Sequence, residues 1–193
     1  MRLGKILLIT GNPGKAEELR LLLPGASLEH RPLDLVEIQS LLPQEIGHAK
    51  ALEALSKLSE EDHTTYDAVL TDDTSLSFDA LGGFPGSLIK YCLDALGTDG
   101  LVALLSGKSN TAKAGCCLSL GLTATGEVVQ FEGILEGRIQ ASSGTSGFGW
   151  DPIFYPEGYD QSFAGMGTPQ KQAISHRSLA AADLLKWLGE PGS

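Results

Sequence analysis

The chain has 193 residues, 42% of them hydrophobic, which is enough to bury one substantial core or two small lobes around a cleft, so we expect a single domain over residues 1–193. Its 24 acidic and 14 basic residues give a net charge of −10, and Lys and Arg nowhere form a run that could neutralise several phosphates of a nucleic acid. Nucleic-acid binding is therefore not expected, whereas a small phosphorylated ligand is compatible with a few local cations, which act at short range.

The first predicted element is a buried strand over residues 5–10, which runs into turn-forming residues and then, from Lys15 to Pro24, into helical spacing. The inward face of that helix is predicted to carry Ala16, Leu19, Leu22 and Leu23. The loop over 10–15 (Thr-Gly-Asn-Pro-Gly-Lys) can bind phosphate, because glycine permits close backbone approach, the helix start offers unpaired N–H groups and Lys15 adds a cation. It lacks the spacing of a Walker A loop, and an ordinary tight turn is the alternative interpretation.

Nothing in the sequence predicts a contact with a membrane. The apolar stretch over 6–9 is too short for a signal peptide, and no segment approaches the ~20 apolar residues of a spanning helix. The three cysteines match no metal-ligand pattern, and an odd count with two adjacent members, Cys116 and Cys117, argues against a disulfide framework. We therefore expect a cytoplasmic protein with reduced thiols.

An acidic pair follows the next two predicted elements. A helix over 44–58 should face inward with Ile46, Leu52, Leu55 and Leu58. A short buried strand over 68–71 then delivers Asp72, Asp73 and Thr74 at its C-terminal end, where carboxylates would lie at the mouth of an α/β sheet. Adjacent residues point in opposite directions, so we expect one carboxylate to be catalytic and the other supporting. A solvated acidic turn is the alternative.

The remaining elements are predicted from periodicity and turn residues. Two helices over 87–96 and 98–105 are separated by Gly97 as a C-terminal stop. A half-buried strand over 112–122, with its apolar residues at even positions, turns at 125–126 into a partner strand over 127–133. Residues 142–147 are expected to form a mobile loop beside a site, and the last helix, from Ser175 or Arg177, ends at Gly189.

Two further motifs suggest a site for a planar base. Residues 148–154 (Phe-Gly-Trp-Asp-Pro-Ile-Phe) combine aromatic rings with an acid, which suits a base platform as well as it suits a core hairpin corner. Residues 175–177 (Ser-His-Arg) at a helix start suit ligand binding, or else a capping serine followed by solvated side chains. From spacing alone, Glu37, Lys50 and Lys90 are surface charges.

Together these motifs resemble the inosine triphosphate pyrophosphatases, a family that hydrolyses noncanonical purine nucleoside triphosphates. The similarity runs in order through residues 10–15, 71–76, 81–86 with Lys90, 148–152, Lys171 and 175–177. The resemblance implies an elongated α/β fold with a long mixed sheet, flanking helices and two lobes around a central active-site cleft. It also implies a homodimer.

The resemblance further implies the site residues. Asp73 is the catalytic acid, and Mg²⁺, with Mn²⁺ as a substitute, is held by Asp73 together with Glu37 or Asp72. The triphosphate is bound by Asn12, Lys15, Lys50 and Thr74, and the base lies against Phe148 or Trp150. The substrate-binding residues implied in this way are Thr10, Gly11, Asn12, Lys15, Lys50, Asp73, Thr74, Lys90, Phe148, Gly149, Trp150, Asp151, Lys171, His176 and Arg177.

The expected activity is hydrolysis of ITP, dITP or XTP to the monophosphate and pyrophosphate, by metal-assisted attack of water at the α phosphorus. Substitutions at Phe148 and Arg177 are expected to change base recognition more than they unfold the protein. Two other hypotheses fit the same motifs less well: a nucleotide-binding regulator without turnover, and a septum-formation-type pyrophosphatase acting on pyrimidine or modified nucleotides.

Overall fold

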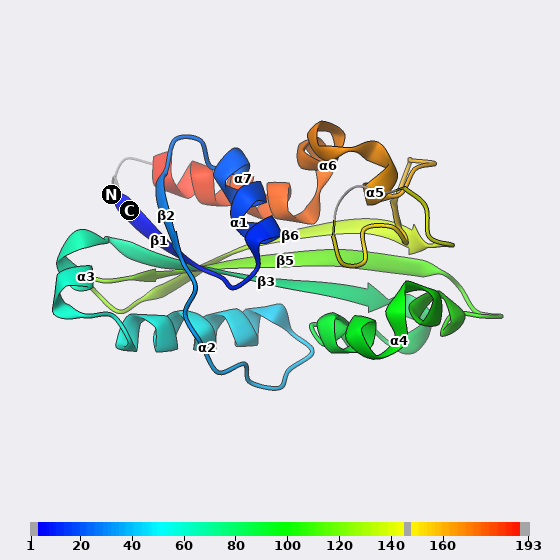
Figure 1. Cartoon of the computed structure of the whole chain (residues 1–193), viewed down its shortest axis with the longest axis horizontal. Coiled ribbons are helices and arrows are strands. Elements are labelled where there is room, and N and C mark those ends of the chain that lie inside the picture. Colours follow the sequence, from blue (N-terminus) through cyan, green and yellow to red (C-terminus); the bar gives the residue numbers. More distant parts are fainter. Residues whose placement is uncertain (1–3, 145–147, 190–193) are drawn as a thin grey trace.

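The computed structural model describes residues 4–144 and 148–189 and shows a mixed sheet between two layers of helices (Figure 1). The strand order is β2-β1-β3-β5-β6-β7, with β4 paired to β3, and β1 runs parallel to both β2 and β3 while the other pairs are antiparallel. The strands are β1 (Lys5–Ile9), β2 (Ser27–Arg31), β3 (Ala68–Phe78), β4 (Pro85–Gly86), β5 (Thr111–Leu122), β6 (Val128–Ile139) and β7 (Phe154–Pro156). The predicted elongated α/β class is confirmed.

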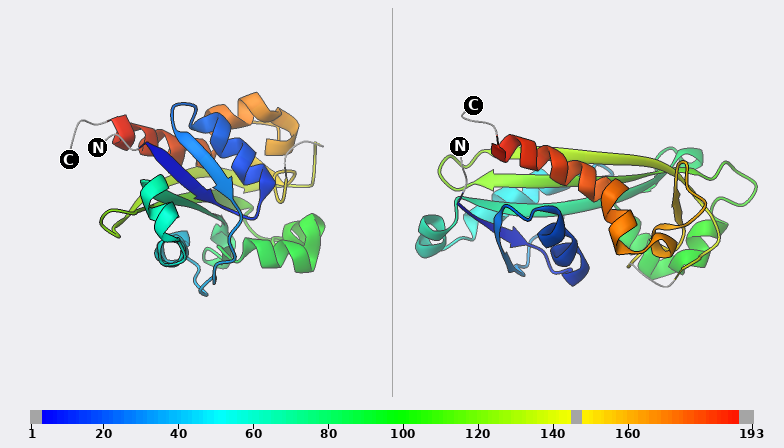
Figure 2. Two further views of the ribbon diagram at one scale, coloured as in Figure 1. Left: turned by 60° about the vertical axis from the view of Figure 1, so that its left-hand side comes forward. Right: turned by 90° about the horizontal axis from the view of Figure 1, so that it is seen from above.

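Helices cover both faces of this sheet. Helices α1, α5, α6 and α7 lie on one face, whereas α2 and α4 lie on the other (Figures 1 and 2). The helices are α1 (Pro13–Leu22), α2 (Pro43–Ser56), α3 (Glu60–Thr65), the 3-10 turn η1 (Asp79–Leu81), α4 (Ile89–Ala103), α5 (Phe163–Met166), α6 (Thr168–Ile174) and α7 (His176–Gly189). None of the helices in the described ranges is long and apolar enough to cross a membrane.

Strand β3 differs most from its prediction. The acidic pair was expected at the C-terminal end of a strand over 68–71, but β3 continues to Phe78. Its polar segment stays extended because β5 pairs with it along its whole length, from Ala68 opposite Leu122 to Phe78 opposite Ala112. Asp72 and Asp73 therefore lie in the middle of a long strand, on a rigid element.

Helix packing explains two other differences. Strand β5 was predicted to be half-buried, yet from Ala114 onward both of its faces are buried, because α2 covers one face and α7 the other. Helix α2 faces the sheet with small residues as well as with Ile46 and Leu55, so Leu52, predicted to point inward, is 44% exposed. The stop predicted at Gly97 is confirmed, since a left-handed Gly97 (φ 66°) breaks α4 into two helical segments.

Strand β3 contributes to three hydrophobic clusters. Near its start, Leu70 packs with β1, α1 and α7, and Val69 packs on the other face with α2. Near its end, Leu76 and Phe78 pack with α4, α5 and β7. Between them lies the polar segment 71–75 (Thr-Asp-Asp-Thr-Ser), where no large apolar side chain joins the clusters. The long strands β3, β5 and β6 run side by side through the molecule (Figure 2), and the acids lie on β3 between the two groups of packed residues.

Candidate active site

The glycine-bearing loop forms the N-terminus of α1. Asn12 caps the helix, because its Oδ1 accepts hydrogen bonds from the backbone N–H of Gly14 (2.9 Å) and of Lys15 (3.3 Å). The loop is also tied to β2 by a 2.7 Å contact between the His30 ring nitrogen Nε2 and the Thr10 carbonyl oxygen. These bonds fix the loop and direct the positive end of the helix toward the space in front of it.

A cleft of about 770 Å³ opens in front of this loop. Eight residues predicted for the site line it, namely Thr10, Gly11, Asn12, Lys15, Glu37, Lys50, Asp72 and Lys90, whereas Asp73 is not among the lining residues. They come from the β1–α1 loop, from α1, from the segment before α2, from α2, from β3 and from α4. The lysines thus meet only in the folded chain, and their charge can hold a polyphosphate in a protein whose net charge is −10.

Asp73 lies on the α2 side of the sheet. Its Oδ1 accepts a 2.8 Å hydrogen bond from Lys50 Nζ, and the same ammonium donates to Glu37 Oε1 at 3.0 Å. Burial raises the pKa of Asp73 despite Lys50, whereas Asp73 and Glu37 raise the pKa of Lys50 despite its burial. From spacing alone, Glu37 is a surface charge. The structure places it in the cleft, paired with Lys50.

Asp72 points to the opposite side of the sheet, as predicted for adjacent strand residues. Its Oδ1 lies 2.9 Å from Lys15 Nζ, and its Oδ2 accepts a 2.6 Å bond from Arg177 Nε. Although burial alone would raise it, Arg177 and Lys15 hold the pKa of Asp72 well below its usual range. Asp72 is therefore a buried anion that joins the phosphate loop to α7.

A second, much smaller pocket of about 30 Å³ lies beyond Arg177. It is lined by Thr74, Phe148, Gly149, Trp150, Asp151, Lys171, His176 and Arg177, so every residue predicted for the base is present. Thr74, which the resemblance assigns to the triphosphate, lies in this pocket instead of lining the larger cleft. The pocket adjoins the cleft through Arg177, Asp72 and Lys15.

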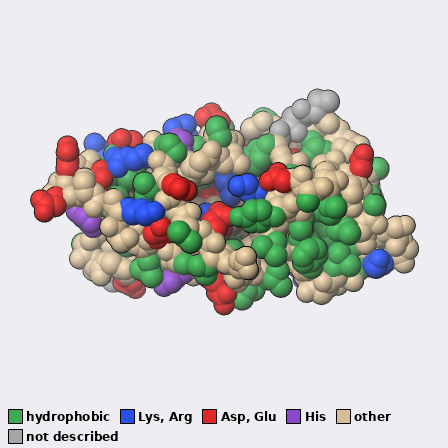
Figure 3. Space-filling model, turned by 60° about the horizontal axis from the view of Figure 1, so that its bottom comes forward, with side chains coloured by type: hydrophobic (Ala, Val, Ile, Leu, Met, Phe, Trp, Pro, Cys, Tyr) green, Lys and Arg blue, Asp and Glu red, His purple; other side chains and the backbone are tan. Residues whose placement is uncertain are grey.

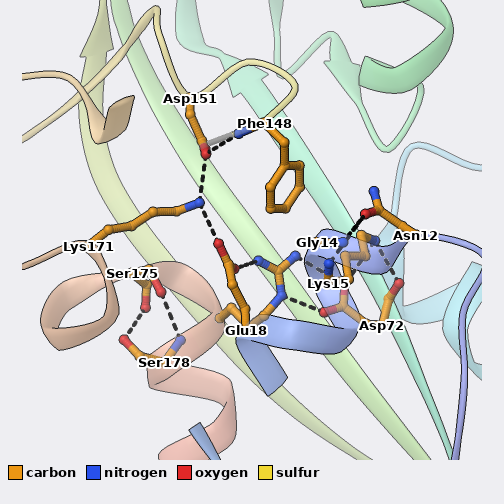
Figure 4. A network of polar contacts seen from close by, with 11 residues as sticks. Asn12, Gly14, Lys15, Glu18, Asp72, Phe148, Asp151, Lys171, Ser175 and Ser178 are labelled. Carbon is orange, nitrogen blue, oxygen red and sulfur yellow. Dashed lines mark hydrogen bonds and ion pairs between the residues drawn. The ribbon is translucent and has the colours of Figure 1, made fainter. Parts of the chain in front are cut away.

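The charged lining of the small pocket forms a continuous chain of ion pairs (Figure 4). Arg177 donates to both Asp72 and Glu18, and Lys171 Nζ donates to Glu18 Oε1 and to Asp151 Oδ2 at 2.7 Å each. Asp151 also accepts from the Phe148 backbone N–H at 2.9 Å. Each cation is held between two carboxylates, so the donors of the pocket have fixed positions.

Sequence reasoning missed Glu18, which holds both Lys171 and Arg177. Helical periodicity carries the signal that could have found it, because Glu18 follows Lys15 by three residues and so lies on the same side of α1. Lys171 lies on α6, a short helix that the sequence also did not predict. The pairing itself depends on tertiary contacts between α1 and α6.

The aromatic residues of the pocket divide into two roles. Trp150 is a core residue that packs against Phe154, Phe163 and the ring of His176. Phe148 lies instead at the pocket, with Lys171 Nζ 4.8 Å from its ring centroid. Of the two interpretations of residues 148–154, the one as part of the core fits Trp150, whereas the one as a platform for a base fits Phe148.

The 175–177 motif divides in the same way. Ser175 caps α7 by accepting a 3.1 Å bond from the backbone N–H of Ser178, as the alternative reading proposed (Figure 4). The same alternative expected solvated side chains at His176 and Arg177, but both are buried. Burial lowers the pKa of His176 far below its usual value, so its ring is neutral at pH 7.

A mobile loop was expected over residues 142–147. Residues 145–147 of this segment lie outside the described residues.

The donor set suits a weakly held divalent cation. Glu37 and Asp73 both bind Lys50 Nζ, so their carboxylates lie close together, and Asp73 Oδ2 is buried without a hydrogen-bond partner. Within the described residues, no group of three or more His, Cys, Asp or Glu side chains is placed to hold a metal alone. Mg²⁺ commonly takes one or two carboxylates and completes its shell with water and substrate phosphates, which fits two acids beside a phosphate cleft.

Comparison with known proteins places these residues in context. A sequence model of the Ham1 family matches residues 6–187. "Inosine triphosphate pyrophosphatase 1" of Trypanosoma cruzi is 41% identical over 183 residues, covering 93% of this chain and 90% of that protein. "Inosine triphosphate pyrophosphatase" of Yarrowia lipolytica is 38% identical over 188 residues, covering 96% of both chains.

Solved structures agree with this result. A HAM1 protein from Coxiella burnetii superposes with a TM-score of 0.81 at 26% identity, covering 97% of this chain and all of that one. A nucleoside-triphosphatase described as a dITP/XTP pyrophosphatase, from Mycobacterium abscessus, superposes with a TM-score of 0.71 at 32% identity, covering 94% of this chain and 98% of that one.

Proposed function

The chain belongs to the Ham1 family, and from that premise we propose that it hydrolyses noncanonical purine nucleoside triphosphates, such as ITP, dITP and XTP, to the monophosphate and pyrophosphate. The observation that carries the proposal is the junction of a wide, lysine-lined cleft with a small buried pocket through Lys15, Asp72 and Arg177. The cleft suits a triphosphate and the pocket suits a base. The names of the relatives point to the same substrates.

The triphosphate binds along the cleft. Thr10, Gly11 and Asn12 present the start of α1, whose free N–H groups and dipole favour phosphate. Lys15 and Lys50 lie on opposite sides of β3 and supply cations deeper in the cleft, and Lys90 adds a third at its exposed edge. These charges stabilise the negative charge that develops on the leaving pyrophosphate.

Glu37 and Asp73 would hold Mg²⁺, or Mn²⁺ in its place, and Asp73 also acts on the attacking water. When bound, the cation would supply positive charge to the phosphate oxygens in addition to that of the lysines. Asp73 accepts the proton of the water that attacks the α phosphorus, since burial makes this carboxylate more basic than a free one. Lys50, at 2.8 Å, keeps Asp73 ionised and oriented.

The base is selected in the small pocket. Hypoxanthine and xanthine carry an oxygen at position 6, whereas adenine carries an amino group there. Lys171 and Arg177 are buried donors, and their N–H groups that the carboxylates do not use pair with this oxygen. Opposite the amino group of adenine the same N–H groups have no acceptor, which rejects ATP. Asp151 and the neutral ring of His176 provide acceptors for base N–H groups.

Phe148 moves when the base binds. The pocket holds about 30 Å³, which is the space of roughly one water molecule and far too small for a purine. Trp150 cannot move, because it is packed into the core, whereas Phe148 is partly exposed on a glycine-flanked loop. The Phe148 ring therefore leaves its position over Lys171 and stacks on the base.

A second copy of the chain covers the apolar face beside the cleft. A groove between the segment 38–41 and α4 exposes large hydrophobic residues, including Phe84 (39% exposed), Tyr91 (56%) and Leu96 (46%). Hydrophobic side chains form a large patch on this face of the molecule (Figure 3). Of the residues that line this groove, only Glu37 is charged, which is the composition of a permanent interface between copies. Leu96→Asp should convert a dimer to a monomer in sedimentation, and a monomeric wild type would refute the proposal.

Product analysis tests the activity. ITP incubated with the protein and Mg²⁺ should yield IMP and pyrophosphate, while ATP and a pyrimidine triphosphate should react far more slowly. EDTA should abolish turnover, because the acidic groups of the cleft cannot face a polyanion unassisted. Binding of ITP without pyrophosphate release would indicate a regulator instead, and preference for a pyrimidine would indicate the septum-formation-type activity.

A further inference from the structure

Helix α2 packs tightly against the sheet at Gly47. A methyl group built on this glycine would lie 2.4 Å from Ser119 Oγ and 3.2 Å from Asp73 Oδ2. The first distance is far below any normal contact between carbon and oxygen, which begins at about 3.3 Å. The sheet therefore leaves no room for even an alanine at position 47.

Ser119, the strand residue that faces Gly47, is fixed by its own hydrogen bond. Gln130 Nε2 lies 2.9 Å from Ser119 Oγ and also donates to the backbone carbonyl of Gln44 at 2.8 Å. Gln130 on β6 thus ties Ser119 on β5 to the first turn of α2. Ser119 is completely buried, so turning its hydroxyl away would break this tie.

The contact lies directly beneath the proposed catalytic pair. Lys50 follows Gly47 by three residues on α2, and Asp73 lies on the neighbouring strand β3. The separation of α2 from β3 at Gly47 therefore sets the 2.8 Å distance between Lys50 Nζ and Asp73 Oδ1. The other oxygen, Asp73 Oδ2, has no hydrogen-bond partner and faces the space that a side chain at position 47 would fill.

We propose that Gly47 and Ser119 form a size-matched pair that positions Asp73 and Lys50 for the reaction. The inference rests on the proposed function of Asp73, and it adds two residues that touch neither substrate nor metal. Their small size lets α2 approach the sheet so closely that the Lys50 ammonium reaches the Asp73 carboxylate. An error of about 1 Å in such a placement can cost roughly 100-fold in rate.

A purely structural role predicts a different result, and the chain offers a matched control. Gly121 also lies on β5 under α2, and a methyl group there would meet Leu55 Cδ1 at 2.9 Å. Gly121 pairs with Val69, four residues before Asp73 on β3. Gly121→Ala therefore pushes the same helix from the same strand, about 13 Å away from the catalytic pair.

The experiment measures kcat and KM for ITP, and Tm, in four variants. Gly47→Ala should lower kcat about 10- to 100-fold with a smaller change in KM. Ser119→Ala should stay within about threefold of wild type. Gly47→Ala combined with Ser119→Ala should recover most of the lost kcat, because the 2.4 Å contact with Ser119 Oγ is removed and the methyl group then faces Asp73 Oδ2 at 3.2 Å and Ser119 Cβ at 3.4 Å. Gly121→Ala should lower Tm at least as much as Gly47→Ala yet keep kcat within about threefold.

If Gly47→Ala does not fold, Ser119→Cys tests the same contact, since a larger atom enters from the strand side and should also lower kcat. Wild-type kcat in Gly47→Ala, no recovery in the double variant, or an equal kcat loss in Gly121→Ala would each overturn the positioning role. An unmutated protein that releases no pyrophosphate from ITP would instead refute the proposed function.

Discussion

The two halves of the site are built differently. The cleft for the triphosphate is open, about 770 Å³ in volume, and its cation Lys90 is exposed. The pocket for the base holds about 30 Å³, and its cations Lys171 and Arg177 are only 5% and 1% exposed. Phosphate needs charge, which acts across an open cleft, whereas telling one base from another needs donors that water cannot replace.

This contrast predicts what substitutions do. Exposed charged residues of the cleft, such as Lys90, should affect KM with little loss of stability, because their surroundings are solvated. Charged residues of the pocket should affect stability as well as recognition, because each is buried between partners. Asp72 and Asp73 allow the sharpest comparison, since they are adjacent in the sequence and yet lie on opposite sides of β3.

The largest effect is expected at Asp73. Asp73→Asn keeps the shape of the side chain but removes a base and a metal ligand, so kcat should fall by about 10²- to 10⁴-fold or more. Its Tm should stay near that of wild type, because Lys50 keeps Glu37 as a partner and burial already disfavours the charge of Asp73. Asp72→Asn should instead lower Tm, because it leaves Lys15 and Arg177 without their shared anion. A larger kcat loss in Asp72→Asn would reverse the two roles; steady-state kinetics across a Mg²⁺ titration decides between them.

Arg177→Ala should mainly destabilise the protein. The side chain is fully buried between Asp72 and Glu18, and removing one partner of a buried ion pair typically costs about 3–5 kcal/mol. The structure thus changes the expectation drawn from the motif, which was a change in recognition with little unfolding. Urea unfolding measures the loss, and a variant as stable as wild type would show that the ion-pair chain contributes nothing to folding.

Phe148→Ala should change recognition without unfolding the protein. The ring is partly exposed and belongs to none of the three hydrophobic clusters, so Tm should hardly change. Loss of stacking on the base should raise KM for ITP by roughly tenfold, in keeping with the ~1–3 kcal/mol typical of base stacking on an aromatic ring. Phe148→Tyr serves as the control that keeps a ring. Unchanged KM in Phe148→Ala would place the base elsewhere.

The smallest effect is expected at Lys90. Lys90→Ala removes one exposed cation from the edge of the cleft, so KM should rise only a few-fold while kcat and Tm stay constant. Because exposed charges are screened, the KM difference between variant and wild type should shrink as salt is added. A kcat loss at all salt concentrations would instead assign Lys90 to the transition state.

Much of the cleft could be predicted from the sequence, because its parts are local. The loop over 10–15 and the helix after it depend on glycine, capping and periodicity, and the divergence of Asp72 and Asp73 follows from strand geometry. The length of β3 could not be predicted. Its polar residues are typical of the end of a strand, and they stay extended only because β5 pairs with them, which no local pattern shows.

The pocket could be predicted only as a set of motifs. That Lys171 and Arg177 are buried, and that Glu18 lies between them, depends on three helices packing together, which no local pattern contains. Glu37 is a comparable case in the cleft, because it lies outside helices and strands and gains its role only through contact with Lys50 on α2. In both places, long-range packing determines which charges meet.

Hydrolysis of ITP in ¹⁸O-labelled water tests the central claim most directly. If water attacks the α phosphorus, as we propose from the pairing of Asp73 with the cleft residue Lys50, the label should appear in IMP and the released pyrophosphate should be unlabelled. Mass spectrometry of the two products separates the cases. Label in the pyrophosphate, or IDP and orthophosphate as the main products, would contradict the mechanism.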